Sequence, residues 1–583
     1  MSPEPTSVEK VDADQTMTAA EAPPPLPGAA LGTKRILSIF VGLVLAVFVS
    51  ALDETIVATA SVKITSDFNA FALYSWIPVS YLVAINSAQP LYGKFSDILG
   101  RRPVLVFGLV IFLLGSAGCG WAPNMPFFLA ARAVAGIGAG GLVGMAYIII
   151  SDLFPIEQCP KYQGFLSGGF ALAAVLGPVL GGVFTSEATW RWCFWINLPM
   201  VGITLVAVLL LLNLPSRKIN SYVNELKRVD VIGAFFLVAT IACLVLPLGL
   251  GGNFWRWNSP QVIVLFIISA LSLAIFLWVQ LRVAAEPIIP VRLLKNVGLI
   301  AAWFTLFFYG MAFITFLYYV PVWSQVVEGM TPITSGLQLL AILGAIVING
   351  FLYEHFLKLA DYLPFPPLRT MLAVGCSIHL LGAILIGSTF TPHLPKGVQV
   401  VFLLIYGLGC GMTIQTSFIS AVVVVDPMDI AMANSLAVLF QNLGDATGLA
   451  ISGAILRATL QAGFRKISAD VVNPSTLSQI LDNPDLINQP GFLPDAARGI
   501  VKAQFVKSLQ LVFRVTIAFA GVALIVGFFT RPPPKEQKGG SDANGDNEEN
   551  GGGEANGRTG VEDDVEKNLG SSKRESSGSM DTS

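Results

Sequence analysis

A short polar segment between two long apolar runs combines acidic and basic side chains at close spacing. Asp97 lies four and five residues before Arg101 and Arg102, and Gly93 and Gly100 flank the aspartate. Glycine allows the backbone to turn tightly, and the planar guanidinium of arginine can bind a carboxylate through two hydrogen bonds. This spacing predicts an ion-paired turn at one membrane surface.

Charged residues also occur inside the apolar runs. An unpaired charge such as that of Arg132 costs about 2.5–3.5 kcal/mol within a membrane helix, so it should face a partner or the bundle interior. The alternative is an arginine whose head group extends to the membrane surface. Asp53 and Glu54 are adjacent, and successive helical residues diverge by about 100°, so at most one points inward. The inward carboxyl group could carry a proton, whereas a solvated pair at the surface is the alternative.

Three polar residues share one face of a later apolar run. Gln441, Asn442 and Asp445 fall at positions i, i+1 and i+4, which places them on one broad helical face. Lipid cannot satisfy their hydrogen bonds, so this face must line a cavity or bond to another helix. The carboxyl group makes a proton or cation role possible in the first case.

A substrate cavity is predicted from scattered polar groups beside an aromatic run. Asn86 and Gln89 stack at i and i+3, Gln415 adds a further amide, and Phe307 and Met311 belong to the aromatic run. An apolar cavity with a few polar groups suits bulky amphipathic ligands of different shapes. The alternative for each aromatic residue is lipid contact or core packing.

Composition identifies a polytopic membrane protein. Of 583 residues, 54% are hydrophobic and 12% are charged, whereas soluble domains carry about 25% charged residues. A net charge of −2 gives no basic field for nucleic acid. The cysteines and histidines form neither a disulfide framework nor a metal-binding cluster, and no phosphate-binding Gly-Lys loop occurs. We therefore expect no metal, no cofactor, no ATP-driven transport and no nucleic-acid partner.

The apolar runs define about fourteen membrane spans, since a helix needs about 20 residues to cross the hydrocarbon core. An even count places both termini on one side, and the lysine and arginine bias of the short loops makes that side cytoplasmic. Polar tails at 1–35 and 531–583 are expected to be disordered. The long loop at 457–507 is expected on the outside, either mobile or with an amphipathic helix near Ala496 to Leu509.

Several of these stretches together resemble the fourteen-span drug:proton antiporters of the major facilitator superfamily, typical of fungal efflux pumps. The segment from Gly93 to Arg102 is similar to the family's loop between spans 2 and 3. The remaining matches are Arg132-x-x-x-Gly136-x-Gly138-x-Gly140-Gly141 for the fourth span, Gly177-Pro178-Val179-Leu180-Gly181-Gly182 for the fifth, and Leu52-Asp53-x-Thr55-Ile56-Val57 for the first.

The resemblance implies an all-α fold with two six-helix bundles, at 36–213 and 299–530, and two extra helices within 214–298. It implies that Arg132 takes part in proton coupling and that Asp53 is the inward carboxyl group. It places bundle movement at Gly177, Pro178, Gly181 and Gly182. Asp445 departs from the pattern, because the resemblance leads us to expect a second glycine there.

The charged turn acts as a latch in this interpretation. Asp97 pairs with Arg101 or Arg102 when the cytoplasmic side is closed, Asp152 is a second acidic partner, and opening inward breaks the set. The expected function is export of drugs, toxins or secondary metabolites in exchange for protons, by a monomer in the plasma membrane. Alternatives are proton-coupled uptake of a solute such as an iron chelate and a non-transporting sensor. No nucleophile elbow or carboxylate dyad suggests an enzyme.

Overall fold

A computed structural model describes residues 33–154, 158–212, 230–251, 255–283, 288–289, 292–360, 362, 364–426 and 429–530. These residues form helices and no sheet. The two polar tails lie outside the described residues, apart from 33–35, where the first helix already begins. The prediction of disorder therefore concerns residues of which nothing is described.

The first bundle is formed by the helices that precede residue 213. They are α1 (Thr33–Asp67), the short η2 (Phe71–Leu73), α2 (Trp76–Leu99), α3 (Arg101–Gly120), α4 (Met125–Leu153), α5 (Cys159–Glu187), α6 (Trp192–Trp195) and α7 (Asn197–Leu211). The last two together make a single membrane span. The extra pair that follows is α9 (Val231–Leu250) and α10 (Pro260–Arg282), which pack on each other.

The second bundle begins after the short η3 (Leu293–Lys295). Its helices are α11 (Val297–Val322), which continues into the π turn η4 (Trp323–Val327), α12 (Pro332–Ala360), α13 (Pro367–Thr389), α14 (Lys396–Val423), α15 (Ile430–Phe464), α16 (Pro474–Asp482), η6 (Pro484–Asn488) and α17 (Asp495–Gly527). The helix expected near Ala496 to Leu509 is the start of the last span, so the loop before it is shorter than 457–507.

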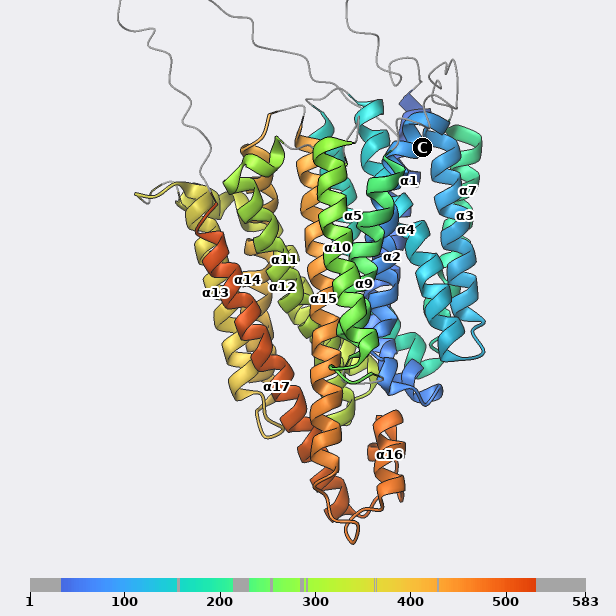
Figure 1. Ribbon diagram of the computed structural model, residues 1–583, viewed down its shortest axis with the longest axis vertical. Helices are drawn as coiled ribbons and strands as arrows, with labels where there is room; N and C mark the ends of the chain where they lie inside the picture. The colour runs from blue at the N-terminus through green and yellow to red at the C-terminus, as the bar shows by residue number, and fades with distance from the viewer. Residues whose placement is uncertain are drawn as a thin grey trace, which may run out of the picture. The chain divides into compact units, whose positions relative to one another are not determined.

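Among the described residues, 13 helices are long and apolar enough to cross a membrane. The further helix is α15, whose 35 residues run the full height of the helical unit beside α11 in Figure 1. Its polar residues Gln441, Asn442 and Asp445 reduce its hydropathy. With α15 included, the fold matches the expected all-α transporter with about fourteen spans.

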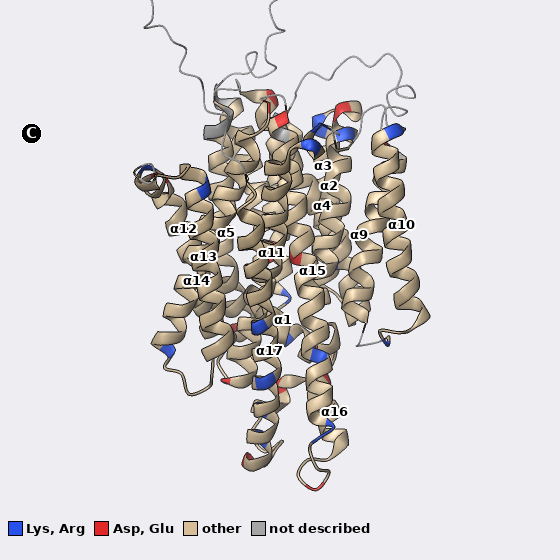
Figure 2. Ribbon diagram, turned by 60° about the vertical axis from the view of Figure 1, so that its left-hand side comes forward, with Lys and Arg blue, Asp and Glu red and all other residues tan. Residues whose placement is uncertain are grey.

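The helices have two ends, which we name by the chain. α1 begins and α17 ends at the terminal face, and α16 lies at the distal face. Charged residues gather near these two faces and leave a mostly uncharged band between them (Figure 2). This distribution is typical of a helical membrane protein, because lipid solvates no charge.

The two bundles touch at the distal face through α5 and α12. A Cβ atom on Gly182 would lie 2.6 Å from the carbonyl oxygen of Pro332, and one on Gly336 would lie 2.3 Å from that of Pro178. Gly164 lies five turns before Gly182, toward the terminal face and on the same face of α5, yet a Cβ there would meet none of the described residues within 4 Å. The two helices therefore diverge toward the terminal face.

Candidate functional site

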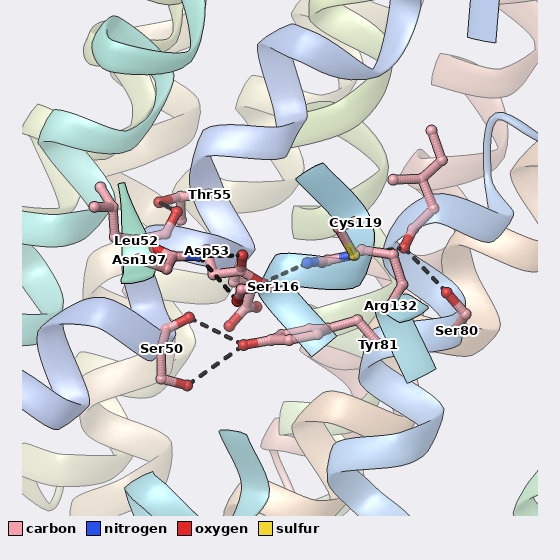
Figure 3. Close-up of polar contacts among 12 residues, drawn as sticks. Ser50, Leu52, Asp53, Thr55, Ser80, Tyr81, Ser116, Cys119, Arg132 and Asn197 are labelled. Carbon is pink, nitrogen blue, oxygen red and sulfur yellow. Dashed lines mark hydrogen bonds and ion pairs between the residues drawn. The ribbon is translucent and has the colours of Figure 1, made fainter. Parts of the chain in front are cut away.

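An ion pair lies in the interior of the first bundle. Arg132 of α4 binds Asp53 of α1 through Nη1 and Oδ2, and both side chains are 0% exposed. Asn197 of α7 donates from Nδ2 to Asp53 Oδ1 at 2.7 Å, and Arg132 Nε donates to the Ile77 carbonyl at 3.4 Å. Figure 3 shows these groups converging from different helices. Arg132 is thus a paired interior charge and does not extend to the membrane surface.

Neighbouring polar and aromatic groups orient this pair. The guanidinium of Arg132 lies 4.2 Å from the ring centroid of Tyr81, and the Tyr81 hydroxyl donates to the Ser50 carbonyl at 3.1 Å. Ser116 accepts from Asn197 Nδ2 at 3.3 Å. Arg132 Nη2 has no hydrogen-bond partner among the described residues. Because both charges are buried, removing one would leave the other buried without an opposite charge.

Asp53 and Glu54 lie on different faces of α1, as helix geometry requires. The backbone carbonyl of Glu54 accepts a hydrogen bond from the Tyr318 hydroxyl of α11 at 3.0 Å, and its carboxyl group lies within electrostatic range of Asp445. Glu54 therefore faces the second bundle. We expected at most one of the two carboxyl groups to point inward, but both face protein, because α1 lies between the two bundles and a divergence of about 100° directs one side chain to each.

Asp445 lies where α15 packs on α11. It is 2% exposed, and its Oδ1 has no hydrogen-bond partner among the described residues. A Cβ on Gly310 would lie 2.8 Å from that oxygen, so the glycine provides the space for the carboxyl group. Gln441 and Asn442 on the same helix are half-buried. These residues share the expected face, and it is directed toward protein.

The residues predicted to line a substrate cavity differ in how deeply their side chains are buried. Asn86 is 0% exposed with both polar side-chain atoms unpartnered among the described residues, whereas Gln89 and Gln415 are half-buried. Met311 packs where Gly448 of α15 meets α11, and the Phe307 ring contacts Phe308 with centroids 5.2 Å apart. The two aromatic-run candidates therefore lie in the α11–α15 contact.

Arg101 of the latch segment forms ion pairs with two carboxylates. Arg101 donates from Nη1 to Asp97 Oδ1 at 2.5 Å and from Nε to Asp152 Oδ2 at 2.6 Å. Arg102 instead donates to the Leu209 carbonyl. Gly100 has φ of 91°, which explains a glycine between α2 and α3. A Cβ atom on Gly93 would lie 3.8 Å from the Ile148 side chain, an ordinary contact, so this position has room for a larger residue.

The latch pairs lie within a single bundle. Asp97, Arg101 and Asp152 all belong to the first bundle, so a rigid movement of one bundle against the other leaves their distances unchanged. Breaking these pairs would need a movement inside the first bundle, and their breaking on inward opening stays a prediction.

The Gly-Pro segment of α5 joins three helices. A Cβ on Gly177 would lie 2.1 Å from Thr55 Oγ1 of α1, and one on Gly181 would lie 2.2 Å from the Ile56 carbonyl. Thr59 donates from Oγ1 to the Pro178 carbonyl at 3.1 Å. With Gly182 against α12, this segment holds α1 on one side and the second bundle on the other.

Comparison with known proteins places this arrangement in a family. A family model described as Major Facilitator Superfamily matches residues 43–449. The chain is 34% identical to the MFS-type efflux pump MFS1 of Trichophyton rubrum over 74% of this chain and 80% of that protein. It is 32% identical to multidrug resistance protein 3 of Bacillus subtilis, over 84% and 95%, and 30% identical to the efflux pump aflT of Aspergillus parasiticus, over 76% and 86%.

Solved structures share the fold. A bacterial homologue of the human lysosomal transporter Spinster, in an inward-facing and occupied conformation, superposes with a TM-score of 0.59 at 15% identity, covering 86% of this chain and 97% of that chain. A D-xylose-proton symporter superposes with a TM-score of 0.51 at 16% identity, covering 79% and 98%. The chain is a multi-pass membrane protein that belongs to the major facilitator superfamily.

Proposed function

We propose that this protein exports amphipathic small molecules in exchange for protons by alternating access. The supporting observation is the position of Asp53 on α1, one residue before the Glu54 carbonyl that bonds to the second bundle. A proton on Asp53 would remove its charge and weaken the pair with Arg132. Because the same turn of α1 carries the contact to Tyr318, such a change reaches the bundle interface directly.

Alternating access requires that one face of the protein is closed while the opposite face is open. The distal face is closed by Gly182, Gly336 and the Tyr318 hydrogen bond, and α5 and α12 diverge at the terminal face. In our proposal the terminal face is cytoplasmic, so this conformation accepts substrate from inside the cell. Several relatives are named as efflux pumps, which favours export over uptake.

The proposed substrate contact is the face of α15 that carries Gln441, Asn442 and Asp445, opposite Glu54. Asp445 Oδ1 has no hydrogen-bond partner among the described residues and lies within electrostatic range of Glu54, so these two carboxyl groups suit a proton or a positively charged part of a substrate. The protein would act as a monomer in the plasma membrane, with lipid around both bundles. The sensor alternative lacks a specific observation in its favour.

The experiment is efflux from cells loaded with a panel of fluorescent amphipathic dyes. We expect export of at least one dye that stops when a protonophore collapses the pH gradient. The Asp53→Asn variant should export no dye, while Asp495→Asn, a change at a side chain that is 95% exposed, should export normally. Export that continues without a pH gradient would contradict antiport.

A further inference from the structure

The connection between α15 and α17 is a packed element. We name residues 465–494 the distal strap; it contains α16 and η6. Ile480 and Ile487 are 0% exposed and belong to the same core as Tyr74 of the first bundle and Phe505 of the second. The expectation of a mobile loop is therefore wrong for this segment, because it buries apolar side chains at the bundle seam.

The strap bonds to the first bundle through one asparagine. Asn483 donates from Nδ2 to the Ser66 carbonyl at 3.1 Å and to Asn69 Oδ1 at 3.2 Å. Asn69 has φ of 49°, the left-handed conformation that asparagine adopts readily, and it lies two residues after the end of α1 at Asp67. Asn483 therefore binds the distal end of α1, the helix that also carries Asp53.

The strap bonds to the second bundle through another asparagine five residues later. Asn488 donates from Nδ2 to the carbonyls of Gln325 at 3.0 Å and Val326 at 3.1 Å. Both carbonyls belong to η4, and π turns frequently occur at functional sites. From the same turn, Gln325 Nε2 donates to the Thr59 carbonyl of α1 at 3.0 Å.

The two attachments differ in strength. Arg457 of α15 donates to the Leu481 carbonyl at 2.9 Å and pairs with Asp482 at 3.3 Å, so the strap is fixed to the second bundle at two places. The first bundle is held through Asn483, through Asp485 beside Lys63 of α1, and through apolar contact. When the bundles separate at the distal face, the strap will stay with the second bundle and release α1.

We propose that the distal strap is a bridge that holds the distal face closed, and that Asn483 is the positioning residue released at each opening. The proposal rests on alternating access as proposed above, since only a face that opens needs a releasable bridge. It assigns a role in the transport cycle to residues that touch neither the ion pair nor the α15 polar face. Its prediction concerns the distal seam and does not depend on which substrate is carried.

The first test measures opening of the distal seam without any substrate. A cysteine at Val62, which is 0% exposed and lies in the core shared with the strap, reports opening through its labelling rate with a membrane-impermeant maleimide. Asn483→Ala should raise that rate about fivefold, as expected for losing one part-buried and one exposed hydrogen bond. Asn483→Asp, which keeps the size but cannot donate, should act in the same direction, and Asp495→Asn should not.

The second test locks the bridge. A short thiol cross-linker between Asn69→Cys and Asn483→Cys should abolish both Val62→Cys labelling and dye export, and reduction should restore them. The matched control links Asp495→Cys to Arg498→Cys, a pair within α17, and should leave both readouts unchanged.

An unchanged Val62→Cys labelling rate in Asn483→Ala and Asn483→Asp, or normal labelling in the cross-linked protein, would overturn the proposal that the distal strap holds the distal face closed. Loss of dye export in every variant, with the labelling differences preserved, would instead refute the proposed function and leave the bridge standing.

Discussion

The hydroxyl of Tyr318 donates to the backbone carbonyl of Glu54 at 3.0 Å, across the seam between the two bundles. Asp53, the preceding residue, is the carboxylate that pairs with Arg132. A buried charge site and an interbundle bond therefore share one turn of α1. Movement of that turn cannot affect one without the other, which is the physical basis of coupling in our account.

Replacing Tyr318 with phenylalanine removes this bond and keeps the ring. One net hydrogen bond is worth about 0.5–1.5 kcal/mol, so the distal-open population should rise by about two- to tenfold. The measurement is the maleimide labelling rate of Val62→Cys, with Tyr362→Phe, a side chain that is 87% exposed, as the control. An unchanged rate would mean that the bond does not contribute to closure.

Neutralising one member of the buried pair should destabilise the protein. Asp53→Asn leaves the Arg132 charge unpaired, and breaking a buried pair typically costs about 3–5 kcal/mol. We expect a clearly lower Tm for the purified protein, measured by thermal unfolding in detergent. The double variant Asp53→Asn with Arg132→Gln should recover much of the loss; if it is as unstable as the single variant, the pair is not the cause.

Removing the arginine that binds both carboxylates of the latch should slow transport. Arg101 pairs with Asp97 and with Asp152, so Arg101→Ala removes both contacts. We expect dye export to fall severalfold with dye binding retained. Export by Arg101→Ala equal to that of the parent protein would show that these carboxylate contacts have no role in transport.

A methyl group at the closed seam should oppose distal closure. In Gly336→Ala the new Cβ would lie 2.3 Å from the Pro178 carbonyl, a distance that requires α12 to move away from α5. We expect faster labelling of Val62→Cys and slower dye export. Gly164→Ala and Gly350→Ala add the same methyl on the diverging ends, where a Cβ would meet no part of the described chain within 4 Å, and should behave as the parent protein.

The strap should hold more weakly as pH rises. Burial raises the pKa of Asp485 in η6 above its ordinary value, and nearby Lys63 opposes this shift while Asp67 adds to it. A carboxyl group with a raised folded-state pKa stabilises the docked strap at low pH and loses this contribution as pH rises through the folded pKa. Val62→Cys labelling, divided by its rate in Asp485→Asn at each pH, should increase with pH; a constant ratio would contradict this.

The sequence alone predicted the helices and the local contacts. The spacing of Asp97 and Arg101 indicated their ion pair, and the cost of a charge in lipid indicated that Arg132 has an interior partner. Both inferences succeed because they depend on neighbours in the chain or on the membrane environment. The α15 span was also found, although Gln441, Asn442 and Asp445 make it the most polar.

Contacts between distant segments could not be predicted in the same way. Tyr318 and Glu54, or Asn483 and Ser66, are separated by more than two hundred residues, and a single sequence carries no pairing signal for them. The strap was misjudged because its alternation of Leu, Ile and Pro with polar residues suits a loop equally well. Its apolar side chains become buried only because the two bundles meet beneath it.

The most direct test of the central claim is proton flux in proteoliposomes that contain the purified protein. With a dye that the wild-type protein exports, we predict that an imposed pH gradient drives dye movement and that dye addition drives proton movement. Asp53→Asn should lose both while still exchanging labelled for unlabelled dye. If Asp53→Asn moves protons and dye as the wild-type protein does, Asp53 is not the coupling residue and the account is wrong.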